Sequence, residues 1–473
     1  MNAMARTDAD VDATTMESLS AVAERLGARM LGSDRRFERV VSDTRQVRAG
    51  DLFVALEGER FDAHEFVLQA EALGAVGSLV AHEVAGASAQ IVAGDTLLAL
   101  QRYAQSWRRD FKLPVIGVTG SSGKTTTKQL LAAVCAARGA VLATEGNLNN
   151  HIGVPLTLLR LRAAHATAVI EMGANHAGEI AELAALAAPT IGIVTQAGDA
   201  HLEGFGSRDG VAHAKGELFA ALDGGVAIIN ADDPYAPLWT TLAARASRIR
   251  FGFDASADVT ASGIELAPDH SRFQLHTPAG SSAVMLPLPG RHNIANALSA
   301  AAAGIALQLT PAQIAAGLAQ ARPAAGRLSL KTTPQGARLL DDSYNANPTS
   351  LRAALELLAT LPGQRWLVLG DMKELGADAA ALHEAAGREA RALGIARIYT
   401  HGALSQRAAA GFSGGHSFDR LEDLIERLRA DLDSDLGADV SVLVKGSRSS
   451  RMERVVAALS DPSTQDDTHA AAH

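Results

Sequence analysis

The sequence predicts an α/β protein with three domains, in which a central doubly wound parallel sheet is flanked by an N-terminal and a C-terminal α/β domain. Two observations predict this fold. In the central part of the chain, short apolar runs alternate with helix-like segments, and at 115–127 one such run passes through a glycine-rich loop into a helix. The length of 473 residues is typical of about three domains.

The predicted N-terminal domain spans 1–112. Residues 51–56 (DLFVAL), 78–81 and 90–93 predict short strands, and 65–74 predicts a helix, so this part forms an α/β layer. Pro114 then introduces the first apolar run of the next domain.

The predicted central domain spans 113–325. Its strand-like runs are 115–118, 167–170, 191–195 and 226–229, and the helix-like segments between them are 128–137, 177–186 and 211–222. Because strands that alternate with helices form βαβ units, this order predicts a parallel sheet with helices on both faces. Short alternating runs at 254–288 predict an antiparallel subsheet, and 293–307 predicts a helix.

The predicted C-terminal domain spans 326–460 and is a smaller doubly wound unit. Strands are expected at 337–341, 365–369, 397–400 and 440–444, and helices at 350–358, 382–393 and 421–432. The polar residues 461–473 predict a disordered tail.

Composition excludes several classes of protein. The 43 Lys and Arg residues against 52 Asp and Glu residues give a net charge of −9, so no basic surplus indicates a nucleic-acid-binding protein. The first 18 residues lack the basic and apolar regions of a signal peptide, and no stretch is apolar enough to span a bilayer, which predicts a cytoplasmic protein without membrane insertion. Cys135 is the one cysteine, which excludes a disulfide framework within the chain, and we interpret it as a core residue.

The glycine-rich loop at 115–127 (VIGVTGSSGKTTT) predicts a phosphate site. Glycines let backbone N–H groups converge on phosphate oxygens, the helix N-terminus adds partial positive charge, and Lys124 adds a full one. The strict G-x-x-x-x-G-K-[ST] pattern fails, because it requires glycine where the chain has Val118. An ordinary glycine turn is the alternative, but the strand before the loop and the Gly-Lys-Thr ending favour nucleotide binding. The predicted contacts are Thr119, Gly120, Ser121, Ser122, Gly123, Lys124, Thr125 and Thr126.

Three further side chains follow strands of the same predicted sheet, where ligands gather in open α/β folds. Glu171 is a candidate metal partner of the phosphate loop, His201 a candidate ligand, and Lys215 one of only seven lysines in the chain. Taken singly, each has a simpler interpretation as a surface carboxylate, a solvated loop histidine or a solvated helix lysine. Asn149 and Asn150 lie in an asparagine-rich turn that suits either a polar substrate or a capped loop. The stretch 230–234 (NADDP) favours a structural turn.

Several motifs in register resemble the Mur ligases, the ATP-dependent amino-acid-adding enzymes of peptidoglycan precursor synthesis. Besides the phosphate loop they are EMGAN at 171–175, AHLEGFGS at 200–207, AKGELF at 214–219, NADDP at 230–234 and GRHNIANALSA at 290–300. Within the family, the stretches at 147–159, 171–180, 341–350 and 369–376 most resemble the branch that adds D-alanyl-D-alanine to UDP-N-acetylmuramoyl-tripeptide. One departure is Asp62-Ala63-His64, where the family often has Asp-Gly-His.

The resemblance implies an N-terminal domain for the UDP-sugar, a central ATPase domain, a C-terminal domain that closes over the site, and a reaction through an acyl phosphate. It implies catalytic roles for Lys124, Glu171, His201 and Lys215, with two Mg²⁺ ions held by Thr125, Glu171, His201 and Lys215, the lysine as a carbamate formed from CO₂. Further nucleotide contacts would be Asn293, Asn296, Arg327 and Asp342. Substrate contacts would be Ser42, Asp43, Thr44, Arg45, Asn149, Asn150, Tyr344, Asn345, Asn347, Lys445, Ser447 and Arg448. We expect a monomer.

Three alternatives stay open at this point. The first is the neighbouring Mur ligase that adds the third residue, although its Asp-Asn-Pro-Arg-like stretch is absent from the sequence. The second is a folylpolyglutamate synthase-like ligase, against which the UDP-binding resemblance at 42–56 argues. The third belongs to another class: a phosphate-loop NTPase switch or regulatory protein, which would need no carboxylate substrate.

Overall fold

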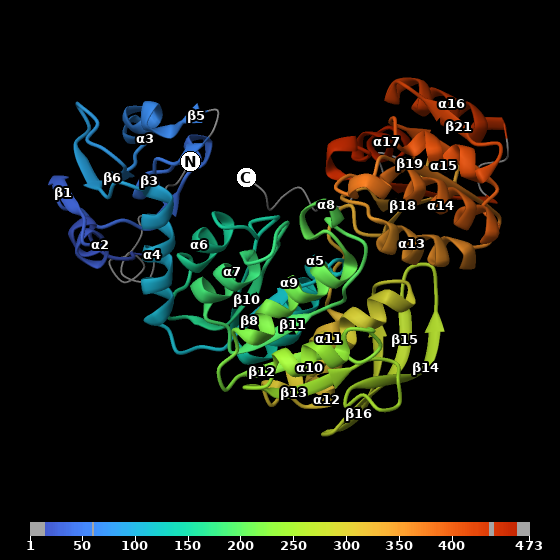
Figure 1. The fold of residues 1–473 in the computed structure, drawn as a ribbon, viewed down its shortest axis with the longest axis horizontal. Coiled ribbons are helices and arrows are strands. Elements are labelled where there is room, and N and C mark those ends of the chain that lie inside the picture. The colour runs from blue at the N-terminus through green and yellow to red at the C-terminus, as the bar shows by residue number, and fades with distance from the viewer. Residues whose placement is uncertain (1–14, 59–60, 435–438, 461–473) are drawn as a thin grey trace, which may run out of the picture. The chain divides into compact units, whose positions relative to one another are not determined.

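The computed structural model describes residues 15–58, 61–434 and 439–460, and Figure 1 shows the fold. The predicted tail at 461–473 lies outside the described residues. Contacts divide the chain into two units. The first comprises Met1–Gly117, Arg138–Gly173 and Glu179–Thr190, and the second comprises Val118–Ala137, Ala174–Gly178 and Ile191–His473.

The N-terminal part of the first unit is a sheet in the order β1-β7-β6-β3-β2. Strand β1 pairs antiparallel with β7, and the other neighbours pair in parallel. The strands are β1 (Arg29–Gly32), β2 (Arg39–Val41), β3 (Asp51–Val54), β6 (Gly77–Val80) and β7 (Ala89–Val92), with helices α2 (Leu19–Leu26) and α3 (Val67–Ala72). The predicted strands and helix of this region are confirmed. β1 and β2 were not predicted, because each offers only three or four residues of mixed burial.

The first unit also contains helices α4 (Thr96–Arg109), α6 (Gly153–Leu158) and α7 (Glu179–Ala187). Helix α4 packs against the other two. Arg108 anchors this packing, since its buried guanidinium donates to the carbonyl groups of Ala187 at 2.9 Å and Ala188 at 3.2 Å. These bonds satisfy carbonyl oxygens that the end of α7 leaves without helical partners.

The central sheet has the order β13-β12-β11-β8-β10-β9. Its strands are β8 (Val115–Thr119), β9 (Ala140–Ala143), β10 (His165–Glu171), β11 (Ile191–Val194), β12 (Val226–Asn230) and β13 (Ser247–Phe251). The pairs β9–β10, β11–β12 and β12–β13 are parallel, which confirms the predicted sheet. The chain continues from β8 to one side and later returns to its other side, so β8 marks the topological switch point at which doubly wound sheets bind ligands.

The helices that follow these strands include α5 (Lys124–Cys135), α9 (Arg208–Ala220) and α10 (Ala236–Leu242). Cys135 is fully buried at the end of α5, as predicted. Strands β14 (Thr260–Leu266), β15 (Ser271–Thr277) and β16 (Gly280–Leu286) form the predicted antiparallel subsheet. Helices α11 (Arg291–Ala306) and α12 (Pro311–Ala319) follow, and α11 confirms the helix expected near 293–307.

The C-terminal sheet has the order β17-β18-β22-β19-β20-β21. Its strands are β17 (Ser329–Thr332), β18 (Arg338–Asp342), β19 (Gln364–Gly370), β20 (Arg397–His401), β21 (His416–Phe418) and β22 (Val440–Lys445). All neighbours pair in parallel except the edge strand β17, which is antiparallel to β18. Helices α13 (Pro348–Thr360), α14 (Ala379–Ala392), α15 (Ser405–Phe412), α16 (Leu421–Ser434) and α17 (Glu453–Leu459) complete it.

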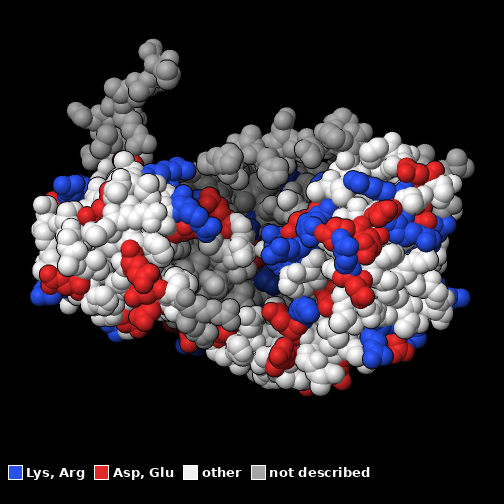
Figure 2. Space-filling model, turned by 90° about the horizontal axis from the view of Figure 1, so that it is seen from above, with Lys and Arg blue, Asp and Glu red and all other residues white. Residues whose placement is uncertain are grey.

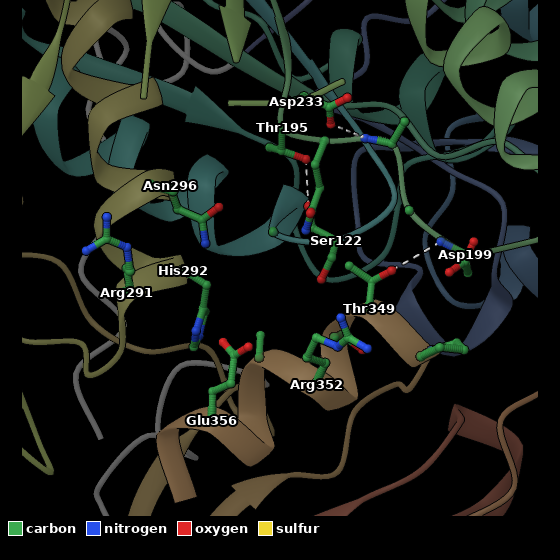
Figure 3. Close-up of a pocket in the computed structure, with 18 of the residues that line it drawn as sticks. Ser122, Thr195, Asp199, Asp233, Arg291, His292, Asn296, Thr349, Arg352 and Glu356 are labelled. Carbon is green, nitrogen blue, oxygen red and sulfur yellow. Dashed lines mark hydrogen bonds between the residues drawn. The ribbon is translucent and has the colours of Figure 1, made fainter. Parts of the chain in front are cut away.

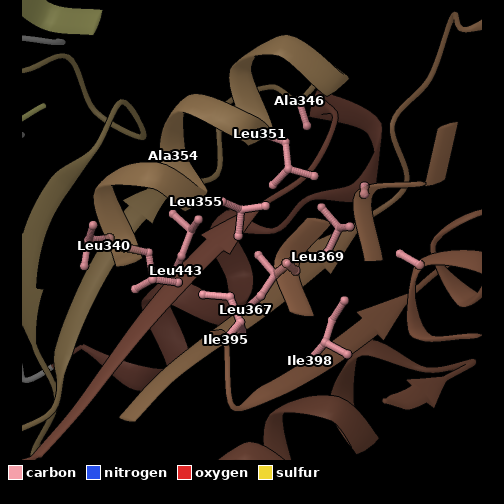
Figure 4. Packing of buried hydrophobic residues seen from close by; sticks show 14 of the residues in the cluster. Leu340, Ala346, Leu351, Ala354, Leu355, Leu367, Leu369, Ile395, Ile398 and Leu443 are labelled. Atoms are coloured by element: carbon pink, nitrogen blue, oxygen red, sulfur yellow. The ribbon is translucent and has the colours of Figure 1, made fainter. Parts of the chain in front are cut away.

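A leucine-rich core holds this sheet against its helices (Figure 4). Leu351 and Leu355 of α13 pack with Leu367 of β19 and Leu443 of β22, all with 1% of their surface exposed or less. The predicted strands and helices of this region are confirmed, whereas the short edge strands β17 and β21 were not predicted.

Lys and Arg side chains are interspersed with Asp and Glu side chains on the face that Figure 2 shows, so charges of both signs share this surface. Among the described residues, no helix is long and apolar enough to cross a bilayer.

Candidate active site

The phosphate loop connects β8 to α5, and two of its glycines have left-handed backbone conformations. Gly120 has φ +142° and Gly123 has φ +83°, which L-residues with a side chain rarely adopt. A Cβ atom on Gly120 would collide with Oγ1 of Thr195, which itself donates to the carbonyl oxygen of Ser122 at 2.6 Å. Lys124 begins α5 and its Nζ donates to the carbonyl oxygen of Gly120 at 2.7 Å. The loop is therefore closely packed on the strand end, with its lysine folded over it.

We expect the Gly120→Ala substitution to lower nucleotide affinity at least about tenfold and to reduce thermal stability. The added methyl group must displace Thr195 or distort the loop, and either movement changes the backbone groups that face phosphate. Isothermal titration with ADP and a melting curve measure the two effects. Gly224→Ala is the matched control, because Gly224 also has a positive φ (+71°) but open space where its Cβ would lie. An equal loss of ADP affinity in both variants would contradict the explanation.

A cavity of about 620 Å³ opens beside this loop within the second unit, a volume in the range of small-molecule sites. Figure 3 shows side chains from four parts of the chain converging on it: Ser122 from the loop, Thr195 from the end of β11, His292 and Asn296 from α11, and Arg352 and Glu356 from α13. The predicted nucleotide contacts that line the cavity are Ser122, Gly123, Thr126, Asn293, Asn296, Arg327 and Asp342. The structure thus brings together residues that are far apart in the sequence.

Helix α11 supplies an asparagine pair to the cavity. Asn293 and Asn296 lie one turn apart, and Nδ2 of Asn296 donates to Oδ1 of Asn293 at 3.3 Å. Oδ1 of Asn296 accepts from Oγ1 of Thr127 at 3.4 Å, which ties α11 to α5. Desolvation, with a smaller effect of the nearby Lys445 charge, lowers the pKa of the neighbouring His292 to about 4, so this ring is neutral at physiological pH.

Sequence reasoning missed a second feature of the cavity. The guanidinium of Arg291 lies 3.8 Å from the ring centroid of Phe253, and both residues line the cavity. Stacked arginine and aromatic planes form a flat surface of the kind that bases stack on. The sequence could have indicated Arg291, because it lies two residues before Asn293 in the GRHN stretch. Phe253 could not have been found in this way, because it follows β13, a strand that was not predicted.

Lys445 and Asp342, which both line the cavity, form a buried ion pair, and Nζ of Lys445 also donates to the carbonyl oxygen of Asn345 at 3.0 Å. Burial raises the pKa of Asp342 and lowers the pKa of Lys445, while their mutual attraction opposes both shifts. The parallel pairing of β18 with β22 places these two residues directly opposite each other.

Glu171 is the last residue of β10 and only 2% of its surface is exposed. Its Oε1 accepts from Nδ2 of Asn149 at 2.9 Å, and its backbone N–H donates to Oγ1 of Thr144 at 2.9 Å. The alternative of a surface carboxylate is therefore wrong. The neighbouring Asn150 accepts from the backbone N–H groups of Ile152 and Gly153, as the capped-loop interpretation expected.

Lys215 and His201 lie in the second unit. Lys215 has 1% of its surface exposed; its Nζ donates to the carbonyl oxygen of Ala174 at 3.1 Å and lies 4.9 Å from the ring centroid of Phe205. A solvated helix lysine is thus the wrong interpretation. His201 precedes the short helix α8 (Leu202–Phe205), and its Nδ1 lies 2.5 Å from Oε2 of Glu374. The contact with His201 holds the pKa of Glu374 below its usual value.

Comparison with known proteins decides the family. The Mur ligase middle domain matches residues 118–304, and the Mur ligase glutamate ligase domain matches residues 326–448. UDP-N-acetylmuramoyl-tripeptide--D-alanyl-D-alanine ligase of Escherichia coli (strain K12) is 44% identical over 94% of this chain and 99% of its own length. The chain belongs to the Mur ligase family.

Solved structures agree with this assignment. A crystal structure of MurF from Acinetobacter baumannii is 37% identical to this Mur ligase, with a TM-score of 0.88 over 93% of this chain and 97% of that chain. MurF ligase from Thermotoga maritima in complex with ADP is 26% identical, with a TM-score of 0.78 over 89% and 96% of the two chains. The predicted fold class and family are confirmed.

In this Mur ligase, several residues predicted to face the amine substrate also have internal partners. The ring centroid of Tyr344 lies 4.4 Å from the guanidinium of Arg327 and 5.7 Å from that of Arg448. Asn347 caps α13 and donates from Nδ2 to the carbonyl oxygen of Ser121 at 3.4 Å. Oγ of Ser447 accepts from the backbone N–H of Lys373 at 2.8 Å. The contact of these side chains with substrate stays a prediction.

Within the N-terminal segment predicted to hold the UDP end, Thr44–Gln46 forms a short 3-10 helix. Asp43 accepts from the backbone N–H of Arg45 at 3.0 Å and pairs with its guanidinium at 2.7 Å, so both side chains are partly engaged with each other. The nearby departure at Ala63 costs no strain, because Ala63 is not among the residues with positive φ. Whether Ser42, Asp43, Thr44 and Arg45 contact substrate stays a prediction.

Asp62, His64 and His82 place potential metal-ligand atoms within 4.8 Å of one another. His64 is nevertheless committed elsewhere, because Nε2 accepts from the backbone N–H of Ala81 at 2.8 Å and Nδ1 lies 2.5 Å from Oδ1 of Asp62. A neutral imidazole has one lone pair, and here Ala81 uses it. The cluster is therefore a structural clamp rather than a metal site.

Proposed function

We propose that this Mur ligase couples ATP hydrolysis to the joining of D-alanyl-D-alanine to UDP-N-acetylmuramoyl-tripeptide, which yields the UDP-N-acetylmuramoyl-pentapeptide precursor of peptidoglycan. The observation that carries the proposal is the 44% identity, over nearly the whole of both chains, to an enzyme of that name. The phosphate loop, its cavity and the buried Glu171 support it, since they provide the parts that phosphoryl transfer needs. We further propose a monomer that acts in the cytoplasm, with the three domains divided near 112 and 325.

In the proposed reaction, the terminal carboxylate of the tripeptide attacks the γ-phosphorus of ATP, and the bond to the bridging oxygen breaks to release ADP. The amine of D-alanyl-D-alanine then attacks the acyl carbon, which expels phosphate, and the amine loses one proton. A free carboxylate is a poor electrophile, so phosphorylation supplies the leaving group. Lys124 and the N-terminus of α5 offset the repulsion between the anionic nucleophile and the phosphates. Arg327, Asn293 and Asn296 would hold the nucleotide in the cavity.

The residues present fit Mg²⁺. Glu171 is a buried carboxylate and Thr125 a hydroxyl group at the start of α5, and oxygen atoms are the ligands that Mg²⁺ prefers. Bound Mg²⁺ would neutralise charge on the phosphate oxygens. We propose that Thr125 and Glu171 hold one ion, that Glu171 and His201 help to hold a second, and that Lys215 contributes as a carbamate. The lysine ammonium first loses a proton, and the uncharged amine then reacts with CO₂, which forms the N–C bond and releases a second proton. The two steps together turn a cation into an anion.

Phosphate release from ATP and Mg²⁺ with UDP-N-acetylmuramoyl-tripeptide, measured with and without D-alanyl-D-alanine, tests the proposal. We expect sustained release only when both substrates are present, together with a pentapeptide product by mass spectrometry. Release that instead requires UDP-N-acetylmuramoyl-dipeptide and a free diamino acid would identify the ligase that adds the third residue. Equal turnover without any muramoyl substrate would favour the NTPase switch.

A further inference from the structure

His201 and Glu374 come from distant parts of the second unit and meet at one point. Nδ1 of His201 lies 2.5 Å from Oε2 of Glu374, a close ion-pair separation without the angles of a hydrogen bond. In addition, the backbone N–H of Glu203 donates to the carbonyl oxygen of Glu374 at 3.3 Å. The loop after β19 therefore touches the segment that begins α8 through a side chain and through the backbone.

Both members of the pair have a left-handed backbone conformation. His201 has φ +55° and Glu374 has φ +64°, and neither is a glycine. Such conformations typically cost about 1–3 kcal/mol and persist where the surrounding structure fixes them, often at functional sites. Two positive-φ residues that direct their side chains at each other indicate an arrangement that the fold maintains.

The loop that carries Glu374 is held by bonds on its own side. The backbone N–H of Met372 donates to Nε2 of the buried His383 at 2.9 Å, and the backbone N–H of Lys373 donates to Oγ of Ser447 at 2.8 Å. Ser447 in turn donates its backbone N–H to the carbonyl oxygen of Asp371 at 2.9 Å. The loop that carries Glu374 is therefore also held by bonds that do not involve His201.

We infer that Glu374 is a positioning residue for His201: its carboxylate lies against Nδ1 of the imidazole and favours the tautomer that carries the ring proton there, so that the lone pair of Nε2 is free to face a metal ion. The inference rests on the proposed function, in which His201 helps to hold a second Mg²⁺. Metal-binding histidines generally present their other ring N–H to a carboxylate, carbonyl or water, which fixes the tautomer and the ring orientation. Since Glu374 lies in the predicted C-terminal domain, the pair also makes the metal site depend on that domain.

Three variants of the full-length chain test the inference. Glu374→Ala removes the carboxylate, Glu374→Gln keeps an oxygen that accepts from Nδ1–H, and Glu203→Gln removes an exposed carboxylate two residues from His201 as the matched control. Mn²⁺, counted by electron paramagnetic resonance with a non-hydrolysable ATP analogue and UDP-N-acetylmuramoyl-tripeptide, replaces Mg²⁺. We expect Glu374→Ala to weaken the second Mn²⁺ about 10- to 100-fold, Glu374→Gln to weaken it less, and Glu203→Gln to leave it unchanged.

Nitrogen NMR of ¹⁵N-histidine-labelled protein gives a readout that needs neither metal nor turnover. We expect the His201 signal, assigned by its absence in His201→Ala, to report a proton on Nδ1 in the wild type and a mixture of tautomers in Glu374→Ala. A proton on Nε2 in the wild type would overturn the inference. If His201→Ala loses the second Mn²⁺ but Glu374→Ala keeps wild-type affinity, the positioning role is wrong and the proposed function stands. If His201→Ala itself keeps both ions, the metal assignment of His201 fails.

Discussion

Replacing Lys124 by alanine is expected to lower kcat by about 10³-fold, a loss of about 4 kcal/mol of transition-state stabilisation. The step that Lys124 serves brings a carboxylate against a phosphate group, and both are anions. Nζ of Lys124 donates to the carbonyl oxygen of Gly120 at 2.7 Å, so the ammonium group lies against the phosphate loop. Neighbouring threonines offer neutral hydroxyl groups and do not replace this charge.

Single-turnover formation of the acyl phosphate, followed by quenching and mass analysis, measures this effect separately from amide formation. Lys112→Ala is the matched control, because Lys112 is exposed and precedes β8; we expect it to keep wild-type rates. A melting temperature near that of the wild type shows that Lys124→Ala is folded. A folded Lys124→Ala variant with normal acyl phosphate formation would remove the lysine from the mechanism.

Most of the strands and helices could be predicted from the sequence, because buried strands and amphipathic helices give a recognisable pattern of apolar residues. The parallel runs that became β8, β10, β11 and β12 were found from their apolar residues alone. The strands that were not predicted include β9, β13, β17 and β21, and all four lie at or next to the edge of a sheet. An edge strand is paired on one side only and is often short and half-exposed, so its residues carry little pattern.

The parts of the site that lie in one continuous stretch of sequence could be predicted. The phosphate loop and the asparagine pair of α11 could be recognised, and the structure places both at one cavity. Contacts between segments that are far apart in the sequence could not be predicted. Nothing in the sequence around Glu374 indicates that it meets His201, and the stacking of Arg291 on Phe253 depends on a strand that was not predicted. The pairing of Lys445 with Asp342 likewise depends on the register of β18 against β22.

The second large effect is expected at Lys215, and it has the opposite electrostatic origin from the effect at Lys124. We expect Lys215→Ala to lower kcat by about 10³-fold, because the proposed carbamate is an anion that helps to hold a metal ion. Lys215 is buried, with 1% of its surface exposed, and only its uncharged amine can react with CO₂. Lys215→Arg should be equally impaired, because arginine keeps the positive charge but forms no carbamate under these conditions.

Added short carboxylic acids distinguish a missing anion from a damaged fold. If the carbamate is the missing group, formate or acetate should restore part of the ligation rate of Lys215→Ala, with a saturable dependence on acid concentration. The same acids should do nothing for Lys124→Ala, which lacks a cation, so the two alanine variants act as controls for each other. Near-wild-type ligation by Lys215→Ala without added acid or bicarbonate would refute the carbamate. Rescue of both variants would show a general effect of the acids, and then neither charge assignment would be supported by the experiment.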